Sequence, residues 1–118
     1  PTHPNVEISI YFIFIFKRFH IYKLFYDTHI LFGSFPNTNF VNSNLQEVDF
    51  SETILSKATF DNCDLKYAIF DQTNIENANF KTSFNFEINP SKNKIKKAKF
   101  SETNVIGLLT AFNIVVEK

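Results

Sequence analysis

Methionine and tryptophan are absent from this 118-residue chain, cysteine occurs once and glycine twice. The single cysteine, Cys63, excludes an intramolecular disulfide and agrees with a reducing compartment, so a cytoplasmic protein is expected. Gly33 and Gly107 are too few to build a glycine-rich phosphate loop, which excludes the nucleotide-binding motifs that depend on one. Without an initiator methionine, the chain is expected to be a fragment.

Groups of side chains that carry chemistry are also scarce. His3, His20 and His29 have no metal-ligand spacing with cysteine or a carboxylate, so no zinc site is predicted. Serine, threonine and aspartate are frequent, but they form no set of nucleophile, base and orienting group. We therefore expect no enzyme activity, no cofactor and no metal.

Long apolar runs are missing too. The longest, from Ile8 to Phe16, is interrupted only by Ser9 and ends at Lys17. This run is too short to span a bilayer core, which needs about twenty residues. It also lacks the preceding positive charges and the small-residue cleavage site of a signal peptide. Two interpretations of residues 1–34 stay open. They are degenerate coils that cap the repeat described next, or a stretch that is not native to the protein, since its commonest residues share A/T-rich codons.

The chain does contain a repeat with a period of five residues. A large apolar residue returns at every fifth position from Phe35 to Phe80, and a small or β-branched residue stands two places before it. Residues two apart on an extended segment point the same way, so each pair can face an interior while the other three positions face water and turn a corner. The large residues also match at a period of twenty, which predicts four units per coil and coils about 4.8 Å apart. The predicted interior consists of Phe40, Leu45, Phe50, Leu55, Phe60, Leu65, Phe70, Ile75, Phe80 and Phe100.

Strings such as SKATFDNCDLKYAIFDQTNIENANF resemble the A(D/N)LxX units of the pentapeptide-repeat proteins, from about Asn37 to Lys81. The resemblance implies an all-β solenoid, a right-handed quadrilateral β-helix, expected here over residues 35–105. The pattern fails where Asn85 and Pro90 replace large residues. We expect residues 83–94 to bulge outward as a loop and Ile95 to rejoin the wall.

The tail, residues 106–118, combines helix-forming GLLTAF with β-branched NIVVE, which predicts a short helix and a strand. This arrangement resembles the carboxyl end of the quinolone-resistance branch of the family, whose members dimerise tail to tail. The alternative is that the tail caps the last coil of a monomer, because solenoid ends need a cap. The candidate dimer or cap residues are Leu108, Leu109, Phe112, Ile114 and Val116.

Charge is unevenly distributed along the chain. Residues 37–80 carry seven acids and two lysines, whereas residues 81–118 carry seven lysines and three acids. Quinolone-resistance members are thought to imitate DNA with an acidic rod and to occupy the DNA-binding saddle of type II topoisomerases such as DNA gyrase. Resemblance implies the same partner here, with Asp49, Glu52 and Asp71 as the candidate binding face. Surface acids also serve solubility, and the basic end departs from a uniformly acidic rod.

Two functions are therefore expected from the sequence. The first is a non-catalytic binder of a type II topoisomerase, and the alternative is a structural or adaptor solenoid for another protein. A third hypothesis, direct nucleic-acid binding, would use the lysines of the C-terminal part, although a protein partner and no direct nucleic-acid contact are expected. These lysines are Lys92, Lys94, Lys96, Lys97 and Lys99.

Overall fold

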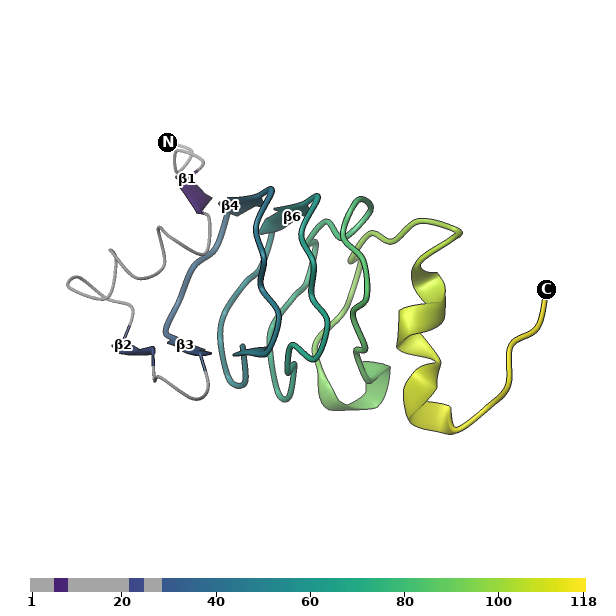
Figure 1. The fold of residues 1–118 in the computed structure, drawn as a ribbon. Helices are drawn as coiled ribbons and strands as arrows, with labels where there is room; N and C mark the ends of the chain where they lie inside the picture. Colours follow the sequence, from purple (N-terminus) through teal and green to yellow (C-terminus); the bar gives the residue numbers. More distant parts are fainter. Residues whose placement is uncertain (1–5, 9–21, 25–28) are drawn as a thin grey trace.

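A computed structural model describes residues 6–8, 22–24 and 29–118. The described part is built of short extended segments that follow one another in stacked layers, closed at the C-terminal end by 3-10 helices (Figure 1). The elements are β1 (Val6–Ile8), β2 (Tyr22–Leu24), β3 (His29–Phe32), β4 (Thr38–Val41), β5 (Val48–Asp49), β6 (Thr59–Asp61), η1 (Pro90–Lys92), η2 (Val105–Leu108) and η3 (Thr110–Phe112).

From Ser34 onward, pairing between layers is parallel and has a constant register. β4 pairs with β6 so that Phe40 lies beside Phe60, and every isolated bridge from Ser34 onward also joins residues twenty positions apart. These bridges fall on four ladders spaced five residues apart along the chain. The predicted twenty-residue period is therefore confirmed: the chain returns to the same lateral position, one layer on, every four units.

The corners between units have a repeated backbone conformation. The residue two places after each large apolar residue has a positive φ, between 49° and 65°, in every unit from Asn37 to Asn77. At several corners the next N–H donates back to the carbonyl of the large residue, as from Ala58 to Leu55 at 3.0 Å. In these four-residue turns, only the third residue has a positive φ, and the N–H of the fourth donates to the carbonyl of the first. This is the geometry of a type II turn.

The interior consists of stacked rings and aliphatic side chains. Phe40, Phe60 and Phe80 stack at centroid separations of 4.7 Å with nearly parallel planes, and Phe50 stacks on Phe70 at 5.0 Å. The two columns meet edge to face, 5.9 to 6.4 Å apart. Aliphatic residues are fully buried on the other two sides, and Phe100 is half-buried against the core. The buried aliphatic residues are Leu45, Leu55, Leu65 and Ile75.

Residues 83–94 differ from the outward loop expected from the sequence. Phe86 and Ile88 are buried, at 4% and 1% exposure, and the Phe86 ring lies 5.8 Å from Phe80. Asn85 takes the positive-φ conformation, so the inward position moves one residue along the chain, from 85 to 86. Pro90 begins η1, where its missing N–H costs no hydrogen bond. On this side of the fold, the interior is therefore filled by Phe86 and Ile88, because the inward positions are shifted relative to the five-residue repeat.

The tail forms 3-10 turns, and the strand predicted over NIVVE is wrong. Residues 114–118 carry no bridge within the described chain, and Val115 is 83% exposed. Propensity alone does not make a strand, because a strand needs a partner and η2 and η3 direct this segment away from the open edge of the last layer. Leu108, by contrast, packs against the core.

The N-terminal part adds further layers. β1 pairs parallel with β4, placing Ile8 beside Phe40, and β3 pairs parallel with β5. The rest of the apolar run that ends at Phe16 lies outside the described residues, so its two interpretations stay predictions. No helix in the described ranges is long and apolar enough to cross a membrane.

Candidate interaction surfaces

The three acids predicted as a binding face lie close together. Asp49 is bridged to Ile69 in the next layer, and the N–H of Glu52 donates to the carbonyl of Asp71 at 3.0 Å. Glu52 and Asp71 are exposed, and Asp49 is half-buried. The Oδ1 of Asp49 accepts a hydrogen bond from the N–H of Ser51 at 2.8 Å. The backbone pairing thus places these three acidic residues in two adjoining layers on one side of the fold.

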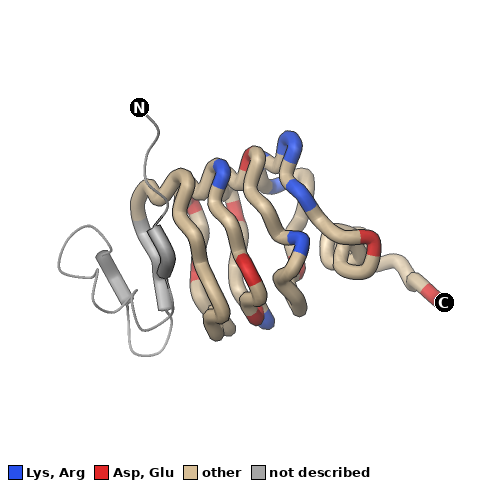
Figure 2. Tube along the Cα trace, turned by 90° about the horizontal axis from the view of Figure 1, so that it is seen from above, with Lys and Arg blue, Asp and Glu red and all other residues tan. Residues whose placement is uncertain are grey.

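A further acid was not singled out from the sequence. Asp64, on the adjoining wall, accepts hydrogen bonds from the side chains of Gln46 at 2.7 Å and Asn85 at 3.0 Å. Partial burial acts to raise the pKa of Asp64, but the bonds from Asn85, from the N–H of Lys66 and from Gln46, with the charge of Lys66, outweigh it and lower that pKa. Asp64 is therefore an ordered carboxylate, and the acidic surface extends over more than one wall (Figure 2). Asp64 stands one residue before the inward Leu65, at the outward centre of its unit. This position was the feature of the sequence that could have indicated its exposure on the wall.

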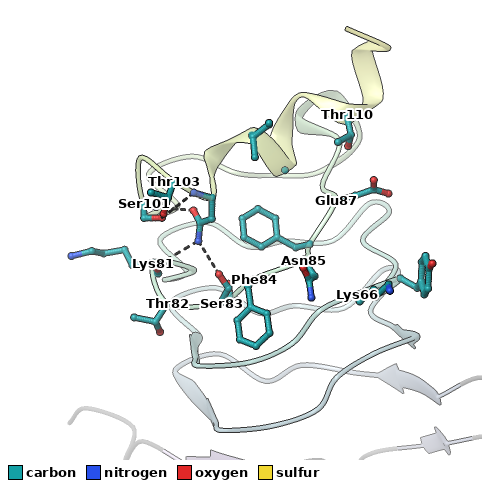
Figure 3. A pocket seen from close by; sticks show the side chains of 15 residues that line it. Lys66, Lys81, Thr82, Ser83, Phe84, Asn85, Glu87, Ser101, Thr103 and Thr110 are labelled. Atoms are coloured by element: carbon teal, nitrogen blue, oxygen red, sulfur yellow. Dashed lines mark hydrogen bonds between the residues drawn. The ribbon is translucent and has the colours of Figure 1, made fainter. Parts of the chain in front are cut away.

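An open groove of about 770 Å³ lies between residues 81–87 and residues 101–110 of the tail region (Figure 3). Phe84 and Ile106, both more than 40% exposed, contribute apolar surface to it, and Tyr67 stands at its edge with Lys66 Nζ 5.2 Å from the ring centroid. The groove was missed because it exists only once the tail is docked. Phe84 carried a signal, since it is a phenylalanine at an outward position of the repeat.

One asparagine attaches the tail, which forms one side of this groove, to the repeat by hydrogen bonds. Asn104 donates from Nδ2 to the carbonyls of Phe80 at 2.8 Å and Ser83 at 2.9 Å. Its Oδ1 accepts from the N–H of Ser101, and the bonds to Ser83 and Ser101 can be followed in Figure 3. Gly107 then lies so close to Phe86 that a Cβ there would meet its carbonyl oxygen at 2.5 Å. The tail can therefore begin its docked turns only with a residue that lacks a side chain at position 107.

The candidate dimer or cap residues divide into two groups. Leu108 and Leu109 are half-buried on the body of the protein, and Leu108 contacts the core. The other three are more than 50% exposed: Phe112, Ile114 and Val116. The first part of the tail thus packs against the body of the protein, and the second part presents apolar surface.

Cys63 carries no reactive thiolate. Its side chain is fully buried, and its Sγ donates weakly to the carbonyls of Phe40 and Asp61 at 3.3 and 3.4 Å. Burial raises the pKa of this thiol to about 11. Across the described residues there is also no cluster of three or more His, Cys, Asp or Glu that could hold a metal ion.

Comparison with known proteins identifies the repeat. A family model described as pentapeptide repeats matches in eight copies, over residues 33–60 and 43–81. Two solved structures of trypsin-treated QnrB1 variants, titled a plasmid-mediated fluoroquinolone resistance protein, are similar at 16% and 15% identity, with TM-scores of 0.39 and 0.40. The matches cover 72% and 81% of this chain but 49% and 52% of those chains, so this chain spans about half their length. No curated protein matches.

Proposed function

Over residues 33–81 the chain belongs to the pentapeptide-repeat family, and from this premise we propose that it is a non-catalytic scaffold whose acidic surface binds a type II topoisomerase in place of DNA. We propose that the four ladders are the walls of a right-handed quadrilateral β-helix over residues 35–105. Residues 106–118 would then form a cap and a dimerisation tail. The proposal also keeps the cytoplasmic location expected from the sequence.

The observation that carries the proposal is the patch formed by Asp49, Glu52 and Asp71. It spans two layers, and the wall segments that form it, residues 48–52 and 68–72, contain no lysine. Two coils rise about 10 Å, and duplex DNA carries about six charges in that length. The excess of five acids over residues 37–80 is of the same order, so a basic saddle would meet a comparable charge density.

The test is a supercoiling assay with purified DNA gyrase, with and without a fluoroquinolone. We expect the protein to change supercoiling or to relieve drug inhibition, and the triple variant Asp49→Asn, Glu52→Gln, Asp71→Asn to lose at least tenfold in potency. A matched variant that removes three acids elsewhere, Glu87→Gln, Glu102→Gln and Glu117→Gln, should retain it. Wild-type protein without effect on gyrase, or equal losses in both variants, would overturn the proposal.

The groove supports the alternative, an adaptor that binds another protein. Exposed aromatic surface at Tyr67 and Phe84 beside lysine resembles the centre of a protein interface, where aromatic residues are enriched. A photo-crosslinking residue placed at position 84 should then capture a protein that is not a topoisomerase, with loss of capture on Tyr67→Ser. Capture of topoisomerase subunits alone would count against the adaptor.

A further inference from the structure

Five lysines lie on one layer at the C-terminal end of the repeat. Bridges from Asn74 to Lys94 and from Asn79 to Lys99 place these two lysines at the outward centres of adjoining walls. Lys96 and Lys97 lie at the corner between those walls, where Lys97 has the positive φ of a corner residue. All five side chains are exposed, and Figure 2 shows the basic residues gathered toward this end. We call Lys92, Lys94, Lys96, Lys97 and Lys99 the lysine collar.

The layer beneath provides two opposing charges, one of which is Asp71, a residue that lines a pocket together with Lys92 and Lys94. Residues twenty positions earlier stand under the collar, and they are asparagine at 74, 77 and 79. Glu76 is the acid under Lys96, through the bond from the N–H of Asn77 to the Lys96 carbonyl. In the described part of the chain, no collar ammonium forms an ion pair or a side-chain hydrogen bond. The ammonium groups of the lysine collar are therefore available to bind an anion from outside the protein.

We propose that the lysine collar binds the phosphate backbone of duplex DNA. Four of its lysines follow a convex corner, with Lys94 and Lys99 on walls that face different directions. A flat bilayer can meet one of these walls at a time, whereas the strands on either side of a duplex groove about 12 Å wide can meet both. The proposed partners of the collar ammonium groups are phosphates, which carry no sequence information directly, so the contact is independent of sequence.

The acidic coils limit how the duplex lies. The patch of Asp49, Glu52 and Asp71 repels phosphates, so DNA cannot lie along the rod and contacts its end alone. The contact then covers about four phosphates. Counterion release predicts a slope of about −3.5 for log affinity against log salt, which is a loss of about 100-fold between 50 and 200 mM.

The experiment measures fluorescence anisotropy of a labelled 30-base-pair duplex with purified protein at several salt concentrations and without any topoisomerase. We expect micromolar binding at low salt with that slope. The variant Lys94→Gln, Lys96→Gln, Lys97→Gln, Lys99→Gln should bind at least tenfold more weakly, with a slope near zero. Its control, Lys57→Gln with Lys66→Gln on the acidic coils, should bind at least as well as the wild type.

Three outcomes would overturn the inference. These are no binding at the lowest salt, equal losses in the collar and control variants, and binding to phosphatidylserine vesicles without binding to duplex. Circular dichroism and thermal melting of each variant establish that the folded proteins are compared. Gyrase plays no part in this assay, so its result and that of the supercoiling assay are independent.

Discussion

Each corner of the repeat depends on a single residue with a left-handed backbone. None of the corner residues from Asn37 to Asn77 is glycine, and asparagine fills four of the nine positions. Asparagine tolerates positive φ better than other residues with side chains, which are disfavoured there by about 1 to 2 kcal/mol. Lysine, glutamate, glutamine and tyrosine at the remaining corners therefore hold residual strain, which substitution can remove.

Replacing Lys57, an exposed corner residue with φ 60°, by asparagine should raise the free energy of unfolding by about 0.5 to 1 kcal/mol. Lys57→Val should lower it by at least about 1 kcal/mol, because β-branched residues avoid positive φ. Urea unfolding followed by circular dichroism measures both. Ser56→Asn, at the preceding corner position without positive φ, is the control and should not stabilise the protein.

The buried thiol of Cys63 makes stability depend on alkaline pH. Because the folded pKa is raised to about 11 from 9.0, the fold favours the neutral thiol. This contribution is fully present below pH 9 and is lost as the pH rises through 11, by about 3 kcal/mol in all. Cys63→Ala, which copies the alanines at equivalent inward positions, should lose less stability between pH 9 and 11 than the wild type. Parallel urea titrations at pH 8 and 11 measure this difference; equal losses in both proteins would contradict it.

At the scale of elements, stability comes from columns of stacked side chains rather than from long strands. The elements are at most four residues long, and the ring stacks continue from one layer to the next. Each layer therefore buries its neighbour's side chains, and no layer is expected to be stable alone.

Phe60→Ala should cost about 3 to 5 kcal/mol, because the ring is fully buried between two stacked rings and two edge contacts. The matched control is Phe84→Ala, since that ring is 41% exposed in the groove and should cost less than about 1 kcal/mol. Thermal and urea unfolding measure both variants. Similar losses at the two positions would contradict the inward and outward assignment.

The tail is attached through one close backbone approach. In Gly107→Ala the added methyl would lie 2.5 Å from the Phe86 carbonyl oxygen and 2.6 Å from its ring, so the tail must lift. We expect a loss of about 1 to 3 kcal/mol and faster proteolysis after residue 104. Thr110→Ala, at an exposed tail position, is the control and should change neither. Limited proteolysis with mass spectrometry identifies the cut.

At the scale of the molecule, the described residues present three surfaces of different character: acidic layers, a lysine collar, and an exposed apolar tail. Formal charge neutrality hides the first two, because their charges cancel in the sum.

The tail predicts self-association. Phe112, Ile114 and Val116 are each more than half exposed, and a second copy would cover them. Sedimentation velocity should show a concentration-dependent dimer that Phe112→Ser with Ile114→Ser converts to monomer without loss of folding. A monomer at every concentration would instead leave the tail as a cap alone.

The twenty-residue period, the four columns and the inward residues followed from the sequence, because a strict period leaves few ways to bury one large residue per unit. Phe86 and Ile88 did not, because a one-residue shift in register changes which side chains face inward, and only contacts across layers select it. The C-terminal strand failed for a related reason, since β-propensity at Ile114 and Val116 cannot supply a missing partner strand.

The sequence by itself therefore determined the repeat, its core and its charge asymmetry, since these follow from local spacing. Only the tertiary structure decided the groove, the place of Asp64 and the joining of the lysines around one corner. These features depend on residues that are distant along the chain and are brought together by coiling and by the docking of the tail at Gly107.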